Sequence, residues 1–161
     1  MLASAEAAGL ALDHKRIDLG LVADQAADAL EPQVDIAGLT LSRQVHPVLV
    51  LGDETRLHQI ITNLLTNAIK FTPAGGCIML TVVRRDRTAE IVVDDTGRGI
   101  PPEDISHIFA RFWRGPTARQ IAGSGIGLAV VREFVRAHGG DVTATSDEGH
   151  GTRVVVALPR A

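Results

Sequence analysis

The sequence predicts an α+β fold, a two-layer α/β sandwich in which helices cover one face of a mixed, mostly antiparallel sheet. Two observations support this prediction. Short stretches rich in Val, Ile and Thr occur in pairs with turn residues between them, as in hairpins. Longer amphipathic stretches separate these pairs, so the chain lacks the regular strand–helix alternation of a doubly wound sheet.

The 161 residues are enough for one domain with its own core. Residues 1–17 are expected to be a linker or the end of a preceding helix, and the domain is expected to span residues 18–160. Cys77 is the single cysteine, so an internal disulfide is impossible.

The first helix is expected to begin after Asp18, whose side chain can cap it. Pro32 is expected to kink or divide this helix near Leu30. Two short strands follow, at residues 39–41 and 45–51. The apolar residues at helical spacing in this first helix are Leu21, Val22, Ala26 and Ala29.

A second, longer helix is expected from Asp53, another capping residue, to about Phe71. Pro and Gly in residues 73–76 end it. Its apolar face consists of Leu57, Ile61, Leu64, Leu65 and Ala68. Two strands are then expected at 78–83 and 90–94, followed by a short helix that opens at 101–104. A loop at 114–122 and a helix at 126–137 come next. The last two strands are expected at 142–146 and 152–158.

Composition excludes several classes of function. With 16 basic and 19 acidic residues the net charge is −3, which does not favour nucleic acid or a membrane surface as a partner. We expect a cytoplasmic location, because no apolar run approaches the roughly 20 residues that span a bilayer and no signal peptide is evident. A Walker-type Gly-Lys-Ser/Thr phosphate loop does not occur.

Three polar residues, Asn63, Asn67 and Lys70, lie at positions i, i+4 and i+7 of the second expected helix and therefore share one face. Carboxamide oxygens suit Mg²⁺, which prefers oxygen ligands and keeps several waters. Lys70 places a positive charge one turn away, where a phosphate could bind. The alternative is that these residues are only the solvated face of an amphipathic helix.

A second patch, Asp95-Thr-Gly97-Arg-Gly99, follows a run of β-branched residues. A carboxylate at a strand end can accept a hydrogen bond from the exocyclic amine of adenine. The two glycines would let the backbone approach the base closely. A plain Asp-Gly turn is the alternative.

Two further glycine patches follow. Gly123-Ser-Gly125-Ile-Gly127-Leu128 precedes a helix, where bare amides and the helix dipole favour an anion. The alternative is a flexible loop before a helix. The last patch, Gly149-His-Gly-Thr152, is by itself usually a turn.

In this order and spacing, the four patches resemble the N, G1, G2 and G3 boxes of the catalytic ATP-binding domain of sensor histidine kinases. That domain belongs to a wider family with gyrase-type ATPases and Hsp90. Residues 108–112 (Ile-Phe-Ala-Arg-Phe) resemble the F box, and residues 52–57 (Gly-Asp-Glu-Thr-Arg-Leu) resemble the usual lead-in. The resemblance covers residues 18–160 and implies a Bergerat-type ATP-binding fold.

The resemblance also implies roles. Asn67 would be the Mg²⁺ ligand, with Asn63 supporting it and Lys70 contacting phosphate. Asp95 would bind the adenine amine, and residues 113–122 would form a lid. The other implied contacts are Gly97 and Gly99 along the base, Ile100, Phe112 and Leu128 packing on adenine, Gly123, Gly125 and Gly127 offering amides, and Thr152 bonding the base or a water. Arg111, Arg114 and Arg119 are candidates for the triphosphate or a partner, or are solvated charges.

Two expected features of related enzymes are missing. Gyrase-type ATPases carry a glutamate base for water where this chain has Asn63, which cannot take a proton, so little hydrolysis is expected. None of the six histidines lies in a motif resembling the His-Glu-x-x-x-Pro-Leu of the phosphoacceptor hairpin. No catalytic residue is assigned, because phosphoryl transfer depends mainly on positioning and charge stabilisation.

The implied function is therefore a histidine kinase half. It would bind Mg²⁺ and ATP and transfer the γ-phosphoryl group to a histidine on a separate domain or protein, upstream of a response regulator. Without the dimerisation hairpin, a monomer is expected. The alternatives are a serine kinase and binding module resembling anti-sigma factors, and a domain that binds ATP without transfer.

Overall fold

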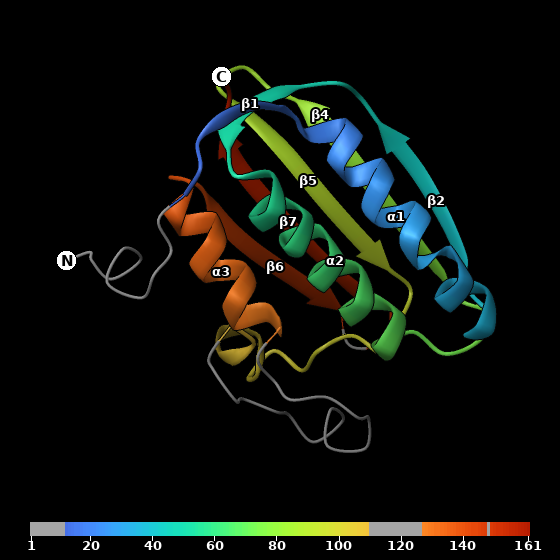
Figure 1. Cartoon of the computed structure of the whole chain (residues 1–161). Coiled ribbons are helices and arrows are strands. Elements are labelled where there is room, and N and C mark those ends of the chain that lie inside the picture. Colours follow the sequence, from blue (N-terminus) through green and yellow to red (C-terminus); the bar gives the residue numbers. More distant parts are fainter. Residues whose placement is uncertain (1–11, 110–126, 148) are drawn as a thin grey trace.

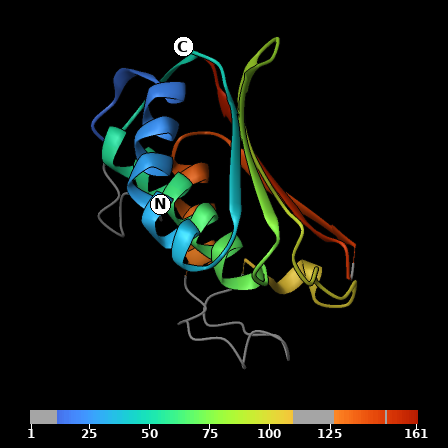
Figure 2. The same ribbon diagram turned by 90° about the vertical axis from the view of Figure 1, so that its right-hand side faces the viewer.

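The computed structural model describes residues 12–109, 127–147 and 149–161. Its described elements form two layers, with three helices packed on one face of a five-stranded sheet (Figure 1). In the view turned by 90°, the helices lie on one side and the sheet on the other (Figure 2). The predicted two-layer α+β class is confirmed. The helices are α1 (Leu19–Ile36), α2 (Glu54–Phe71) and α3 (Gly127–Ala137), and a 3-10 turn, η2, spans Ile105–His107.

The main sheet has the strand order β2-β4-β5-β7-β6. The β2–β4 pair is parallel, whereas β4–β5, β5–β7 and β6–β7 are antiparallel. The sheet is therefore mixed and mostly antiparallel, as predicted, and β5 is its central strand. Its strands are β2 (Thr40–Val45), β4 (Cys77–Arg84), β5 (Thr88–Asp95), β6 (Asp141–Asp147) and β7 (Gly151–Pro159).

The core lies between the helices and the sheet. Alternate residues of β4, namely Ile78, Leu80 and Val82, are buried, because successive side chains of a strand point to opposite faces. The predicted apolar face of α2 is buried in full: Leu57, Ile61, Leu64, Leu65 and Ala68. Within the described ranges, no helix has the length and apolar character that crossing a bilayer requires.

The region between α1 and α2 differs from the prediction. The strand expected at 45–51 does not form as such: β2 extends from Thr40 to Val45, and a separate strand, β3 (Leu49–Gly52), begins after Pro47. Pro47 lacks the N–H that a continuing ladder needs, which explains the interruption. Strand β3 leaves the main sheet and pairs with β1 (Lys15–Asp18), a strand that the sequence did not reveal.

Helix α1 also differs from the prediction. It continues through Pro32 to Ile36 instead of dividing near Leu30. Leu30 and Val34 are both buried, so core packing anchors the helix on either side of the exposed proline. The predicted apolar face was partly wrong, because Leu21 and Ala29 are exposed. The buried face consists of Leu19, Val22, Ala23, Ala26, Ala27, Leu30 and Val34.

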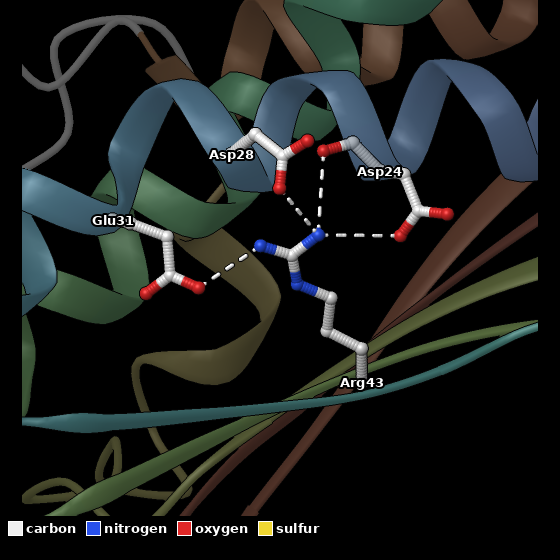
Figure 3. Close-up of polar contacts among 4 residues, drawn as sticks. All are labelled: Asp24, Asp28, Glu31 and Arg43. Atoms are coloured by element: carbon white, nitrogen blue, oxygen red, sulfur yellow. Dashed lines mark hydrogen bonds and ion pairs between the residues drawn. The ribbon is translucent and has the colours of Figure 1, made fainter.

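Arg43 of the edge strand β2 fastens α1 to the sheet through three carboxylates (Figure 3). Its Nη1 lies 2.8 Å from Asp28 and 3.3 Å from Asp24, and its Nη2 lies 2.9 Å from Glu31. Burial alone would lower the pKa of Arg43, but the hydrogen bonds to these carboxylates raise it above the ordinary value. The edge strand is thereby held against the helix layer by charge as well as by apolar packing.

Asp53 joins three segments at the start of α2. Its Oδ1 accepts a hydrogen bond from the N–H of Arg56 at 3.3 Å, which confirms the predicted cap. Its Oδ2 accepts from the N–H of Asp13 at 3.1 Å, and its own N–H donates to Nε2 of His138 at 3.1 Å. The segment before β1, helix α2 and the end of α3 therefore meet at one residue.

His138 is held in one neutral tautomer by this arrangement. Its Nδ1 lies 2.7 Å from the carbonyl of Phe134 and must carry the hydrogen, whereas Nε2 accepts from Asp53 and must not. The ring also packs where a Cβ at Gly52 would overlap it, so the glycine before Asp53 leaves the room that it needs. Burial lowers the pKa of His138, the nearby His14 lowers it further, and Phe134 and Asp53 only partly oppose this.

This arrangement predicts a specific pH dependence of stability. Between the lowered pKa of folded His138 and its unfolded value near 6.5, the unfolded chain binds the proton and the folded chain does not. The free energy of unfolding should therefore fall as the pH drops through this window. Urea unfolding between pH 7.5 and 5 should show this fall, and His138→Gln should remove part of it.

A change at an exposed histidine, His46→Gln, is the matched control and should leave the wild-type pH slope in place. An equal slope in the wild-type chain and the His138→Gln variant would contradict the assignment of a neutral, buried His138.

Candidate functional site

The candidate site lies at the end of the central strand β5, where β5 is paired with the start of β7. Asp95 is the last residue of β5 and stands opposite Thr152 in the register. Its Oδ1 accepts hydrogen bonds from the N–H of Gly97 at 2.9 Å and from the N–H of Thr152 at 3.2 Å. Two of the predicted patches, far apart in sequence, are thus joined at one carboxylate.

The carboxylate of Asp95 is only partly compensated. Burial raises its pKa above the ordinary value, the two N–H groups oppose the rise, and the charge of the adjacent Asp94 adds to it. No other hydrogen bond to the Asp95 carboxylate occurs within the described part of the chain, so Oδ2 is the oxygen available to a ligand. A half-buried acceptor in this state favours a ligand that donates an N–H.

Two glycines around this carboxylate have no room for a side chain. A Cβ at Gly97 would overlap the carbonyl oxygen of Phe71, and one at Gly151 would overlap the carbonyl oxygen of Asp95. Gly151 also has a φ of +120°, which L-residues rarely adopt. The backbone is therefore packed closely against other segments of the chain at these two glycines.

The C-terminal end of α2 adjoins the same loop. The N–H of Arg98 donates to the carbonyl of Phe71 at 3.4 Å, which ties the loop after β5 to the last residue of the helix. Asn63 and Asn67 are half-buried and Lys70 is exposed, on the side of α2 opposite its buried apolar face. The predicted polar face is thus present, and along the helix its three residues span about 10 Å.

Ser146 is a member of this cluster that the sequence analysis missed. Its Oγ accepts from the N–H of Ile100 at 2.6 Å, donates to the carbonyl of Gly151 at 2.9 Å and lies 3.0 Å from Oγ1 of Thr152. A serine within a strand carries no sequence signal of its own. Only the pairing of β6 with β7, which sets Ser146 opposite Thr152, brings it to the site.

The other predicted residues are placed as follows. Ile100 is half-buried against the core, and Gly99 has a φ of +75°. Gly127 is the first residue of α3, and Leu128 is half-buried beside the core. Phe112, Gly123, Gly125, the expected lid at 113–122 and the three arginines Arg111, Arg114 and Arg119 lie outside the described residues. The short helix expected from 101–104 is confined to η2, which begins at Ile105.

A metal held by several charged side chains is not evident. Among the described residues, no group of three or more His, Cys, Asp or Glu side chains is placed to hold an ion. Carboxamide oxygens, such as those of the half-buried Asn63 and Asn67 on α2, are a donor type that suits a hard cation.

The site therefore has a half-buried acceptor, closely packed glycine backbone and, on α2, a polar helix face. This combination suits a flat ligand with an amine at one end and an anionic group at the other. The sequence pattern of one protein family, described as histidine kinase-, DNA gyrase B-, and HSP90-like ATPase, matches residues 52–161. The chain belongs to this ATPase family.

Individual members of this ATPase family are similar over most of the chain. The histidine protein kinase DivJ of Caulobacter vibrioides is 43% identical over 133 residues, covering 81% of this chain and 22% of DivJ. A structure titled mycobacterial sensor histidine kinase MprB superposes with a TM-score of 0.83 at 32% identity, over 91% of this chain and 98% of that chain. A full-length structure of ShkA in complex with AMPPNP superposes with a TM-score of 0.82 at 31% identity, over 93% of this chain and 32% of that chain.

The chain spans less than two fifths of the length of the curated relatives that it matches. The activities of these longer proteins as wholes are therefore not assigned to this chain by their similarity alone. The shared part contains the Asp95 site and the polar face of α2.

The raised pKa predicts that Asp95 lowers stability at neutral pH. Between its unfolded value and its raised folded value, the folded chain binds the proton and the unfolded chain does not, so stability falls as pH rises. Asp95→Asn keeps the Oδ1 acceptor and removes the half-buried charge. This variant should unfold at a higher temperature than the wild-type chain at pH 7.

The matched control is Asp86→Asn, a charge removal at an exposed position, which should leave the unfolding temperature nearly unchanged. A clear loss of stability in Asp95→Asn would show that the carboxylate charge stabilises the fold.

Proposed function

We propose that this chain is the ATP-binding half of a protein histidine kinase. It binds Mg-ATP at the Asp95 site and transfers the γ-phosphoryl group to a histidine on a separate phosphoacceptor domain or protein. The observation that carries the proposal is the half-buried, partly compensated carboxylate at the end of β5. Adenine offers such an acceptor the N–H of its exocyclic amine.

The residues around Asp95 fit the rest of the nucleotide. Gly97 and Gly99, which carry no side chain, would line the flat base, and Ile100 and Leu128, half-buried against the core, would pack on adenine. Thr152 is hydrogen-bonded to Asp95 and lies beside the base position. We extend the same assignment to Phe112, Gly123, Gly125 and Gly127 on the basis of the sequence pattern alone.

The polar face of α2 fits the triphosphate and its cation. Asn67 would hold Mg²⁺ with support from Asn63, and Lys70 would contact a phosphate. A bound Mg²⁺ would neutralise part of the negative charge of the phosphates. The residues of this chain position the nucleotide and exclude water from the base.

The residues of this chain favour transfer of the γ-phosphoryl group to a separate acceptor over hydrolysis of ATP. Asn63 cannot act as a base toward water, because a carboxamide does not take a proton at neutral pH. His138 is buried and both of its ring nitrogens are hydrogen-bonded, so this histidine is unsuited to accept a phosphoryl group. We assign the acceptor histidine to a separate phosphoacceptor domain or protein, and a response regulator would receive the phosphoryl group next.

The names of the relatives support the kinase assignment. DivJ is a histidine protein kinase and CusS of Escherichia coli is a sensor histidine kinase, and the ShkA structure contains the ATP analogue AMPPNP. The alternative of a serine kinase makes a different chemical prediction, because phosphoserine is stable to acid and phosphohistidine is not.

The test is incubation of the chain with Mg²⁺, γ-labelled ATP and a helical hairpin that carries a His-Glu-x-x-x-Pro-Leu motif. Acid-labile label should appear on the hairpin, and the same hairpin with its histidine changed to alanine should stay unlabelled. Without a hairpin, phosphate release should remain near background. Rapid phosphate release by the chain alone, acid-stable label, or bound ATP without any transfer would contradict the proposal.

A further inference from the structure

Ser146 fills every hydrogen-bonding position of its hydroxyl within the candidate site. A hydroxyl has one hydrogen to donate and two lone pairs to accept with. The hydrogen is directed to the carbonyl of Gly151 at 2.9 Å, and the N–H of Ile100 donates to the oxygen at 2.6 Å. One lone pair of Ser146 remains, facing Oγ1 of Thr152 at 3.0 Å.

Either hydroxyl could be the donor in the contact between Ser146 and Thr152. With the hydrogen of Ser146 directed to the Gly151 carbonyl, the hydrogen of Thr152 points at Ser146. The oxygen of Thr152 is then left with lone pairs only. The N–H of the same residue is held by Asp95 at 3.2 Å, so this acceptor is fixed beside the carboxylate.

We infer that Ser146 is a specificity-determining residue that makes the site select a 6-amino purine over a 6-oxo purine. The inference rests on the proposed function, in which Asp95 and Thr152 face the base. With the Thr152 hydrogen held by Ser146, both groups are hydrogen-bond acceptors. They suit the amine of adenine and repel the carbonyl oxygen of hypoxanthine or guanine.

Ser146 also holds two backbone segments of the site in position. Through Ile100 it fixes the end of the loop that begins at Asp95, and through Gly151 it fixes the turn before β7. It lies on β6, outside the four sequence patches, and so acts on the base through Thr152 and Ile100.

The experiment compares the affinities of Mg-ATP and Mg-ITP, measured by calorimetric titration. These nucleotides differ at position 6 and share the sugar and triphosphate. In Ser146→Ala the hydroxyl of Thr152 is released, can rotate and can donate to the 6-oxo group. The ratio of ATP affinity to ITP affinity should therefore fall roughly three- to tenfold, the worth of one neutral hydrogen bond.

Ser146→Thr keeps the hydroxyl and should keep most of the wild-type ratio, and Thr145→Ala, at the exposed neighbouring position of β6, is the matched control. Ser146→Cys, close in size and with weak hydrogen bonds, gives the same readout if the alanine variant does not fold. Thermal unfolding identifies the folded variants.

A fall in ATP and ITP affinity by equal factors in a folded Ser146→Ala or Ser146→Cys chain would overturn the inference, because it indicates a structural role alone. An unchanged ratio would overturn it as well. Failure of the wild-type chain to bind either nucleotide is a different result and would instead contradict the proposed function.

Discussion

The half-buried carboxylate of Asp95 is the constraint around which this end of the molecule is arranged. Its two backbone donors, Gly97 and Thr152, come from a loop and a strand that are more than 50 residues apart in the chain. These two hydrogen bonds do not fully compensate the burial of the charge, so the pKa of Asp95 stays raised. The hydrogen-bonding capacity that these two donors leave unused makes the Asp95 carboxylate a strong acceptor for an N–H from a ligand. The incompletely compensated charge also makes it a weak point in the stability of the fold.

The opposite ends of the helices are held by a separate junction. Asp53 caps α2 and, through its N–H, fixes His138 at the end of α3. The candidate phosphate face of α2 begins two turns or more beyond this cap, and Gly127 begins α3. Helices α2 and α3 are thereby fixed to each other at the start of α2 and the end of α3, while Arg43 fastens α1 to the sheet edge.

Local signals predicted much of the fold and of the site. The caps at Asp18 and Asp53 are short-range interactions and were predicted correctly, as were the β4–β5 and β6–β7 hairpins. The first expected pair was wrong, because β2 pairs with β4 and β3 pairs with β1. Strand β1 was missed because four residues with little apolar pattern become a strand only through pairing with β3. Pro32 was expected to divide α1, but local propensity was outweighed by burial on both sides.

The same distinction applies within the site. The glycines and Asp95 could be predicted because close backbone packing demands a rare residue type at each position. Ser146 could not, because its role depends on the register of β6 against β7 and on three hydrogen bonds that no local pattern records. Strand pairing, not composition, therefore determines which of the common polar residues belong to the site.

Direct titration of Mg-ATP into the wild-type chain and into Asp95→Asn tests the central claim, that this carboxylate binds the adenine amine. The variant keeps the backbone hydrogen bonds but loses the charged acceptor, so its affinity should fall by about 1–3 kcal/mol in binding free energy. Equal affinity in the two chains, with both of them folded, would show that Asp95 does not contact the base.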